Sequence, residues 1–257
     1  KKNKLFLIED CSQAHGAVYK GKKVGSFGDI STWSFCQDKI ISTGGEGGMI
    51  STNNKQLWLK CWSLKDHGKN YKSVFLKKHK IGFRWHHDDL GTNYRMTEMQ
   101  AILGRAQLKI LDNQIKKRNI IANLYLNGLK DYFNKYSILK KPNLNFRYSP
   151  QTKDKKVIRK NVHAFYRLNL FVNKNKINQL KLLEQLNLKR INCGVGSCPE
   201  IYREKVFKKL KLSPKKRLVN AKLLGETSIT FPIDPNRSIA KLKLEIKSIK
   251  TILNKYI

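Results

Sequence analysis

The chain has 257 residues, of which 40% are hydrophobic, and a formal net charge of +35. This length and hydrophobic content suffice for one large or two modest folded domains, and they exclude a disordered tail. No apolar run reaches the length of a membrane span, and the first residues lack the long apolar stretch and cleavage site of a signal peptide. We therefore expect a soluble, cytoplasmic protein without a membrane partner.

The excess of lysine raises the hypothesis of nucleic-acid binding, because clustered Lys and Arg side chains neutralise phosphates. The lysines, however, are spread along nearly the whole chain. Arginine, whose planar fork suits phosphate, is comparatively rare. This distribution favours a solvated, lysine-rich surface, and we predict no nucleic-acid partner.

The cysteines are odd in number and scattered, at Cys11, Cys36, Cys61, Cys193 and Cys198. This arrangement argues against a disulfide framework and suits a reducing compartment. Cys193 and Cys198 lie close together, but no second Cys or His pair follows at ligand spacing. We therefore predict ordinary loop cysteines and no metal site.

The first part of the chain predicts short strands separated by turns. Leu5–Ile8 is a continuous apolar run closed by Glu9 and Asp10, which indicates a buried strand with acidic groups at its carboxyl end. Ligands bind at that end in open α/β sheets. Residues 18–24 predict a hairpin, and residues 30–35 predict a second strand.

A glycine-rich segment follows the second predicted strand. After Gln37-Asp38-Lys39, four glycines occur within residues 44–48, before the apolar pair Met49-Ile50. Glycine loses more conformational entropy on ordering than any other residue. The segment therefore indicates backbone that packs tightly beside a ligand or another chain.

The middle of the chain predicts helices around a long loop. Residues 54–64 have the composition of a surface helix, whereas residues 67–90 show little periodicity and predict a long functional or mobile loop. Thr97 and Gln100 form a capping-box pattern that starts a long helix, expected to bend and to end near Tyr132.

The last part of the chain predicts a second, smaller α/β unit. Residues 142–160 are polar and basic with two prolines, as in a boundary loop. A strand is predicted at 164–172, and helices at 177–188 and 242–253. We expect two domains, residues 1–132 with the long connecting helix and residues 133–257.

Four side chains in the first part have the chemistry that pyridoxal phosphate requires. This cofactor needs an amine for a Schiff base, an anion beside the pyridine nitrogen and donors for the phosphate. Asp10 ends the first predicted strand, Gln13 follows it, Ser34 lies in the next strand and Lys39 comes five residues later. Singly, each has an ordinary explanation as a surface charge or a strand hydroxyl. Their joint spacing and the glycine-rich segment carry the prediction.

Three segments carry a family resemblance. They are IEDCSQAHGAVYKGKKVGSFGDISTWSF, QDKIISTGGEGGMI and GTNYRMTEMQAILGRAQL, followed more loosely by VHAFYRL and GSCPEIY. In this order they resemble successive signature blocks of the DegT/DnrJ/EryC1/StrS family of sugar aminotransferases.

The resemblance implies an α/β, fold-type I architecture like that of aspartate aminotransferase. It has a mostly parallel sheet in the large domain, incomplete here, and a small C-terminal α/β domain. The family likeness also implies a homodimer with shared sites and the transfer of an amino group, usually from glutamate, to a keto-sugar nucleotide. Lysine at position 39 favours transamination over dehydration, because the related dehydratases carry histidine there.

By motif position, the resemblance implies a role for each of four residues at the cofactor. Asp10 pairs with the pyridine nitrogen, Gln13 contacts the ring and Ser34 binds the phosphate. Lys39 is the catalytic residue and carries the cofactor.

The resemblance extends to residues outside this window. Asn93 matches an asparagine that reaches the neighbouring subunit's cofactor phosphate, and Arg95 is expected near the substrate. His15 has either a direct role or that of a buried, hydrogen-bonded histidine. We interpret residues 86–89 (HHDD) as a substrate-facing or solvated loop, since this chemistry needs no metal.

One difference from the family is large. Its members begin with a sizeable segment that supplies a Gly-Thr or Gly-Ser phosphate cradle and an aromatic residue stacked on the cofactor, whereas this sequence starts almost at the Asp10 strand. We therefore expect this chain alone to bind the cofactor poorly. The alternatives are a truncated, non-catalytic fragment and a basic protein that binds nucleic acid or another anionic polymer.

Overall fold

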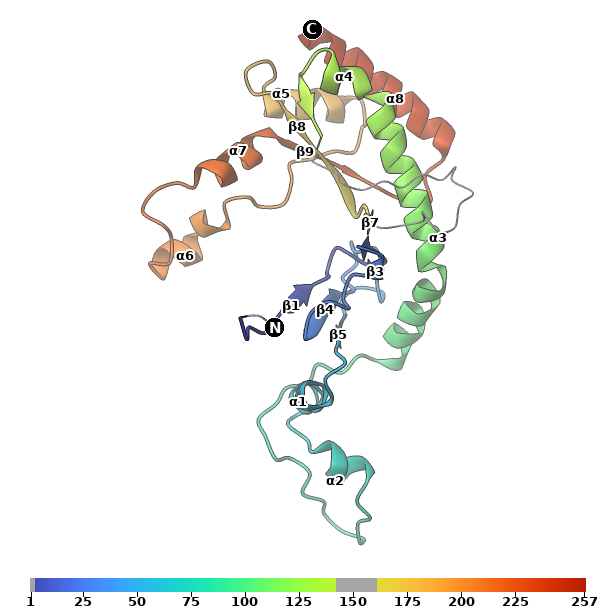
Figure 1. Cartoon of the computed structure of the whole chain (residues 1–257), viewed down its shortest axis with the longest axis vertical. Coiled ribbons are helices and arrows are strands. Elements are labelled where there is room, and N and C mark those ends of the chain that lie inside the picture. Colours follow the sequence, from blue (N-terminus) through green and yellow to red (C-terminus); the bar gives the residue numbers. More distant parts are fainter. Residues whose placement is uncertain (1–2, 142–160) are drawn as a thin grey trace. The chain divides into compact units, whose positions relative to one another are not determined.

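The computed structural model describes residues 3–141 and 161–257, whose helices and strands are labelled in Figure 1. These residues form two compact units: unit 1 contains residues 3–113 and 161–164, and unit 2 contains residues 114–141 and 165–257. The loop predicted at 142–160 lies outside the described residues, and the domain boundary after residue 132 remains a prediction. Within the described ranges, no helix is long and apolar enough to cross a membrane.

Unit 1 is built on a three-stranded mixed sheet of order β1-β4-β5. β1 (Ile8–Asp10) is parallel to β4 (Ile30–Ser34), which pairs with β5 (Gly48–Ser51) in the antiparallel direction. In this register Asp10 lies beside Thr32. Because β1 and β4 are parallel, their carboxyl ends meet at one edge of the sheet, where ligands bind in α/β folds.

The prediction of a buried strand at Leu5–Ile8 is wrong for this structure. β1 begins only at Ile8, and the four side chains of the run are 52–84% exposed. The backbone N–H of Leu7 donates to the Asp29 carboxylate at 2.8 Å, and this bond holds the run beside the loop that precedes β4. β1 lies at the edge of its sheet, and within the described residues no layer covers the run.

The predicted hairpin is confirmed. β2 (Val18–Tyr19) and β3 (Lys22–Lys23) pair in the antiparallel direction across Lys20 and Gly21, whose φ angles are 48° and 82°. Positive φ at both central residues matches the right-handed twist of the flanking strands. β2 also pairs with β7 (Asn161–Val162), which gives a second three-stranded sheet of order β3-β2-β7.

The helix predicted at 54–64 is confirmed as α1 (Lys55–Lys65). Its N-cap is Asn54, whose side chain accepts hydrogen bonds from two backbone N–H groups of the first turn. Such a cap satisfies donors that have no partner inside the helix.

The loop predicted at 67–90 contains a short helix that the sequence did not indicate, α2 (Tyr71–Phe75). The side chain of Asn70 caps it by accepting from the N–H of Ser73 at 3.0 Å. The Tyr71 ring lies edge-on to Trp62 of α1, with centroids 5.0 Å apart. This contact between two helices stabilises a single turn that has too few residues to show periodicity.

The long helix α3 (Glu98–Gly128) begins at the predicted capping box. The N–H of Gln100 donates to Thr97 Oγ1 at 3.3 Å, and the N–H of Thr97 donates to Gln100 Oε1 at 3.0 Å. The helix ends at its glycine rather than near residue 132. Leu129 leaves the helical conformation with φ −101° and ψ 14°, and α4 (Lys130–Asn134) follows separately.

Unit 2 is built on an antiparallel sheet of order β6-β8-β9, with β6 (Leu139–Lys140), β8 (Arg167–Val172) and β9 (Ser228–Pro232). β8 starts later than predicted because Phe165 has a φ of 44°, which an extended strand does not allow. The remaining elements of unit 2 are α5 (Gln179–Leu188), η1 (Ile201–Arg203), α6 (Lys205–Lys209), α7 (Val219–Thr227), α8 (Ile239–Leu253) and η2 (Asn254–Tyr256). The helices predicted at 177–188 and 242–253 are thus confirmed as α5 and α8.

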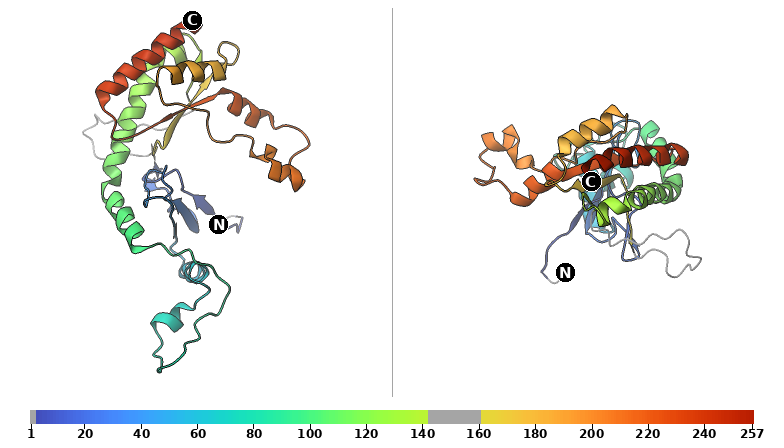
Figure 2. Two further views of the ribbon diagram at one scale, coloured as in Figure 1. Left: turned by 180° about the vertical axis from the view of Figure 1, so that it is seen from behind. Right: turned by 90° about the horizontal axis from the view of Figure 1, so that it is seen from above.

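The core of unit 2 lies between this sheet and its helices. Leu170 of β8 and Phe231 of β9 are fully buried, and the Phe231 ring lies 5.2 Å from that of Tyr125 on α3. Figure 2 shows α8 running alongside the second half of α3. The Tyr125 hydroxyl donates to the Glu245 carboxylate of α8, which links the two helices.

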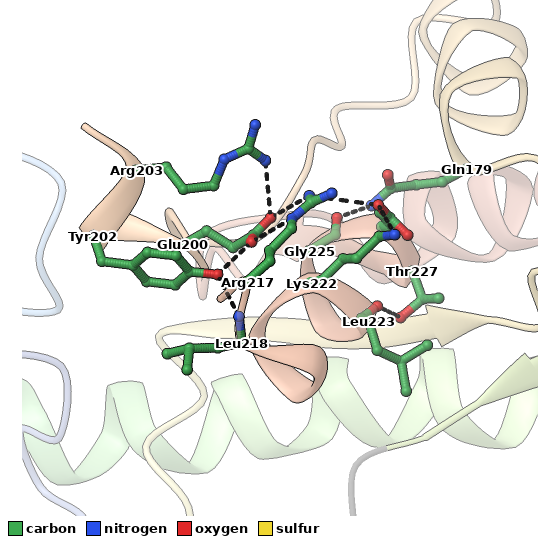
Figure 3. Close-up of polar contacts among 11 residues, drawn as sticks. Gln179, Glu200, Tyr202, Arg203, Arg217, Leu218, Lys222, Leu223, Gly225 and Thr227 are labelled. Atoms are coloured by element: carbon green, nitrogen blue, oxygen red, sulfur yellow. Dashed lines mark hydrogen bonds and ion pairs between the residues drawn. The ribbon is translucent and has the colours of Figure 1, made fainter. Parts of the chain in front are cut away.

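A polar cluster around Glu200 ties together the segment between α5 and α7, as Figure 3 shows. The Glu200 carboxylate accepts from Arg217 Nε at 2.7 Å, from the Tyr202 hydroxyl at 2.6 Å and from Arg203 at 3.3 Å. The Tyr202 hydroxyl in turn accepts from the N–H of Leu218 at 2.9 Å. The hydrogen bonds from Arg217 lower the pKa of Glu200 to about 2.

We expect this cluster to make the free energy of unfolding depend on pH in the acid range. The carboxylate has a lower pKa folded than unfolded, so its stabilising contribution is complete above pH 4.5 and is lost as pH falls towards 2. Wild type should therefore unfold at higher urea than Glu200→Gln near neutral pH, and this difference should vanish towards pH 2. The exposed Glu184→Gln is the control; an equal pH dependence in both variants would contradict the assignment.

Candidate functional site

Three of the predicted site residues lie at the carboxyl edge of β1 and β4. Asp10 is the last residue of β1, and Ser34 is the last residue of β4. Lys39 lies in the turn that follows, where its N–H donates to the Cys36 carbonyl at 3.0 Å. The N–H of Cys36 donates to Ser34 Oγ at 3.4 Å. A carboxylate, a hydroxyl and an amine thus gather at one sheet edge.

Asp10 is held in its ionised form. Its Oδ1 accepts from the hydroxyl of Ser12 at 2.6 Å and from the N–H of Ser12 at 3.0 Å. These hydrogen bonds, together with the positive charge of Lys39, hold the pKa of Asp10 below its usual value. The interaction places the Lys39 ammonium within electrostatic reach of the Asp10 carboxylate.

Lys39 is largely withdrawn from solvent. Its side chain is 16% exposed, and Nζ lies 3.5 Å from Oδ1 of Asp38. The next two residues, Ile40 and Ile41, are 4% and 1% exposed and anchor the turn in the core of unit 1. An amine next to an anchored backbone has a defined position, as a nucleophile requires.

The glycine-rich segment folds back beside Lys39. The N–H of Phe35 donates to the Gly47 carbonyl at 2.7 Å, and the N–H of Thr43 donates to the Phe35 carbonyl at 3.2 Å. A Cβ on Gly47 would lie 2.2 Å from Thr43 Oγ1. The segment is thus closely packed at Gly47, but against its own chain; packing beside a ligand or another chain remains a prediction.

Gln13 and His15 follow β1 in a turn closed by the N–H of Ala14 and the Cys11 carbonyl at 2.9 Å. Gln13 is exposed, and its contact with a cofactor ring remains a prediction. His15 is 2% exposed, with its ring 5.4 Å from that of Trp33. The burial of His15 expected in one of its two interpretations is confirmed, whereas a direct role remains a prediction.

Asn93 and Arg95 lie in a second cluster, centred on Asp66. Asp66 and Asn93 form an antiparallel bridge, and Asp66 Oδ1 lies 3.1 Å from Lys69 Nζ and 3.7 Å from Arg95 Nε. Asn93 Oδ1 accepts from Arg95 Nε at 3.1 Å. Burial raises the pKa of Asp66, but the hydrogen bond from Lys69 and the nearby cations outweigh it and hold the pKa low.

The loop 86–89 is anchored within unit 1. His86 Nδ1 lies 2.9 Å from Ser73 Oγ, and the Asp88 carboxylate accepts from the Asn70 side chain. In the described part of the chain, no group of three or more His, Cys, Asp or Glu side chains could hold a metal ion. A role of this loop towards substrate remains a prediction.

Gly68 holds the Asp66 cluster against the same loop. Its carbonyl accepts from the N–H groups of Asp88 and Asp89, both at 3.1 Å. With φ at 79°, a Cβ on Gly68 would lie 1.7 Å from the Asp89 carbonyl oxygen. A side chain there would clash with backbone, which cannot rotate away.

We expect Gly68→Ala to lower the free energy of unfolding by about 2–4 kcal/mol, from left-handed strain plus the clash. Gly21→Ala is a matched control, because Gly21 has nearly the same φ, 82°, and nothing within 4 Å of its Cβ. That variant should cost only about 1 kcal/mol. If both variants lost the same free energy of unfolding in urea, the contact with the Asp89 backbone would not contribute to stability.

Glu9, next to Asp10, has a structural role that the sequence did not predict. Glu9 accepts from the N–H groups of Gly25, Phe27 and Gly28 at 2.8, 2.6 and 2.6 Å. Burial raises the pKa of Glu9, but these backbone donors outweigh it and hold the pKa below its usual value. Glu9 thereby fixes the loop that leads into β4. The acidic pair at the end of an apolar run was the only signal in the sequence, and it does not specify this partner.

The residues at the sheet edge fit pyridoxal phosphate. The edge presents an amine at Lys39, a carboxylate at Asp10 with a lowered pKa, and a hydroxyl at Ser34. These are the amine, the anion and the donor that this cofactor requires. The lowered pKa matters most, because only an ionised carboxylate can keep a pyridine nitrogen protonated.

Comparisons with known proteins identify relatives in sequence and in fold. A GDP-perosamine synthase of Escherichia coli O157:H7 is 44% identical over 146 residues, which cover 53% of this chain and 37% of that protein. The solved aminotransferase of Psychrobacter cryohalolentis is 41% identical, with a TM-score of 0.90 over 99% of this chain and 63% of that chain. NtdA of Bacillus subtilis, solved with bound cofactor PMP, is 21% identical, with a TM-score of 0.74 over 98% of this chain and 51% of that chain.

The chain thus spans less than two thirds of the length of these relatives. Its α/β, fold-type I architecture is confirmed by the solved structures. Residues 1–249, nearly the whole chain, match the model of the DegT/DnrJ/EryC1/StrS aminotransferase family. The chain belongs to the DegT/DnrJ/EryC1/StrS aminotransferase family.

Proposed function

We propose that this chain is the cofactor-bearing part of a pyridoxal-phosphate-dependent aminotransferase that acts on a nucleotide-linked keto-sugar. The observation that carries the proposal is the Lys39 amine in the turn after β4, at the carboxyl edge where the neighbouring strand β1 ends in an ionised Asp10. Family membership and the resemblance to a GDP-perosamine synthase support the reaction and the substrate class. The PMP bound to NtdA, a form of the same cofactor, supports the cofactor.

Each residue of the edge has one task in this proposal. Asp10, held ionised by Ser12, would pair with the ring nitrogen, and Ser34 would donate to the phosphate. Gln13 would contact the ring. When bound, pyridoxal phosphate would supply an electron sink for the substrate carbon at which the amino group is exchanged. Lys39 Nζ would carry the cofactor and then move a proton to and from that carbon.

The remaining parts of the proposal concern partners. Glutamate would be the amino donor, and Arg95, oriented by Asp66 and Asn93, would bind the anionic substrate. Asn93 would reach the cofactor phosphate of a second subunit in a homodimer. We also infer that the protein acts in the cytoplasm, where sugar nucleotides are available for amino-sugar and polysaccharide synthesis.

Covalent labelling tests the proposal directly. Because this chain alone is expected to bind the cofactor poorly, the complete enzyme is incubated with pyridoxal phosphate, reduced with borohydride, digested and mapped by mass spectrometry. The label should saturate and should lie on Lys39, since this amine is withdrawn from solvent at the sheet edge that would bind the cofactor, whereas surface lysines react weakly and without saturation. A label spread over many lysines, or one that saturates elsewhere, would contradict the proposal.

A further inference from the structure

One face of α3 binds the backbone of the segment that follows Lys39. Gln107 Oε1 accepts from the N–H of Ser42 at 3.1 Å, and Gln107 Nε2 donates to the carbonyl of the same residue. Gln100 Nε2 donates to the Glu46 carbonyl at 2.9 Å. The two glutamines are seven residues apart, which is about two helical turns, so they project from the same face.

Close packing fills the space between these two glutamines. A Cβ on Gly44 would lie 3.1 Å from Leu103 Cδ1, and a Cβ on Gly104 would lie 3.1 Å from Thr43 Cγ2. Thr43 itself is 1% exposed. Residues 42–46 therefore lie on α3 with little free space, and the hydrogen bonds at their two ends set where along the helix they lie.

The position of Ser42 bears directly on Lys39. Only Ile40 and Ile41 separate the two residues, and both are buried. The N–H of Thr43 also donates to the carbonyl of Phe35, the residue that directly follows β4. The turn that carries Lys39 is thus held at one end by β4 and at the other by Gln107, and a shift of Ser42 must shift the amine.

The chemistry of the Gln107 contact is specific. A primary amide both donates and accepts, so one side chain satisfies the N–H and the C=O of Ser42. An apolar side chain of similar size would fill the same volume but leave two half-buried backbone groups without these partners. Volume alone therefore does not account for glutamine at this position.

We propose that Gln100 and Gln107 are positioning residues that set the orientation of the Lys39 amine by holding residues 42–46 on α3. The proposal deepens the proposed function and rests on it, since the orientation of Lys39 matters for catalysis only if that residue carries the cofactor. Gln107 contributes more to this positioning than Gln100, because it makes two hydrogen bonds next to the turn that carries Lys39. Gln100 makes one, at the far end of residues 42–46.

The test compares Gln107→Met, which keeps the volume, with Gln107→Glu, which can still accept from Ser42 but cannot donate. Gln56→Ala, at an exposed position in the first turn of α1, is the control. Two measurements are made on the full chain without cofactor: hydrogen exchange of residues 40–46, and the pH profile of Lys39 acetylation by acetic anhydride, each read by mass spectrometry.

We expect Gln107→Met to speed exchange in residues 40–46 about tenfold, because two hydrogen bonds are lost. The Lys39 acetylation profile should change as well, because the amine moves relative to Asp38 and its other neighbours. Gln107→Glu should lie between Gln107→Met and wild type, and Gln56→Ala should match wild type. Global unfolding in urea identifies any variant that fails to fold, and in that event Gln100→Met is measured in the same way.

Two outcomes would overturn the proposal. Unchanged exchange would show that Gln107 does not hold the segment, and faster exchange with an unchanged Lys39 profile would show a purely structural contact. Both measurements are independent of cofactor. Failure of the borohydride label on Lys39 would instead contradict the proposed function and leave the positioning result standing as a property of the fold.

Discussion

Replacing Lys39 with alanine should lower the aminotransferase rate of the complete enzyme by on the order of 10⁴-fold or more, since it removes both the covalent anchor and the proton carrier. Lys39→Arg should be as inactive, although it keeps the positive charge. A guanidinium does not lose its proton at any working pH and so cannot act as a nucleophile. The measurement is the transfer of the amino group from glutamate to a nucleotide-linked keto-sugar, followed by mass spectrometry of the product.

The control for this prediction is an exposed lysine of the same unit. Lys60 lies on α1 and is exposed, so Lys60→Ala should retain the wild-type rate. The fold should survive both changes at position 39, because the turn is anchored by Ile40 and Ile41. Measurable turnover in Lys39→Arg, or equal losses at positions 39 and 60, would remove Lys39 from the proposed mechanism.

Replacing Leu170 with alanine should lower the free energy of unfolding of unit 2 by about 3–5 kcal/mol. Leu170 lies on the central strand of the sheet, opposite Ile229, and is 0% exposed. Truncation removes apolar surface from the core and leaves a cavity that the neighbouring strands β6 and β9 prevent from collapsing. Urea unfolding followed by circular dichroism gives the difference.

Leu244→Ala provides the matched comparison, with the same change of side chain in the same unit. Leu244 is on the outer face of α8 and is 66% exposed, so its truncation should cost less than about 0.5 kcal/mol. A loss at Leu170 below 1 kcal/mol would mean that the core is not packed as the buried side chains indicate. A large loss at Leu244 would mean that α8 is covered by a partner.

Features that depend on neighbours in the chain could be predicted from the sequence. The hairpin at Lys20 and Gly21 follows from turn chemistry, and the start of α3 follows from the reciprocal pair Thr97 and Gln100. The alternation of β8 follows from one buried face. The site window from Asp10 to Lys39 belongs here as well, because parallel strands that follow each other closely bring their carboxyl ends together.

Features that depend on distant residues could not be predicted. The sequence does not show that Gln107 binds Ser42, 65 positions away, or that Arg95 lies against Asp66. It also predicted burial for Leu5–Ile8, because an apolar run indicates a preference for burial but not whether another layer covers it.

The amino-acid sequence by itself thus determined the family, the larger helices and the chemical groups of the candidate site, since these are encoded in local patterns and motif spacing. Only the tertiary structure decided how those groups are held. The lowered pKa of Asp10, the withdrawal of Lys39 from solvent and the hydrogen bonds from α3 to residues 42–46 all arise from contacts that form on folding. A side chain acquires its pKa and its orientation from its surroundings, and the surroundings exist only in the folded chain.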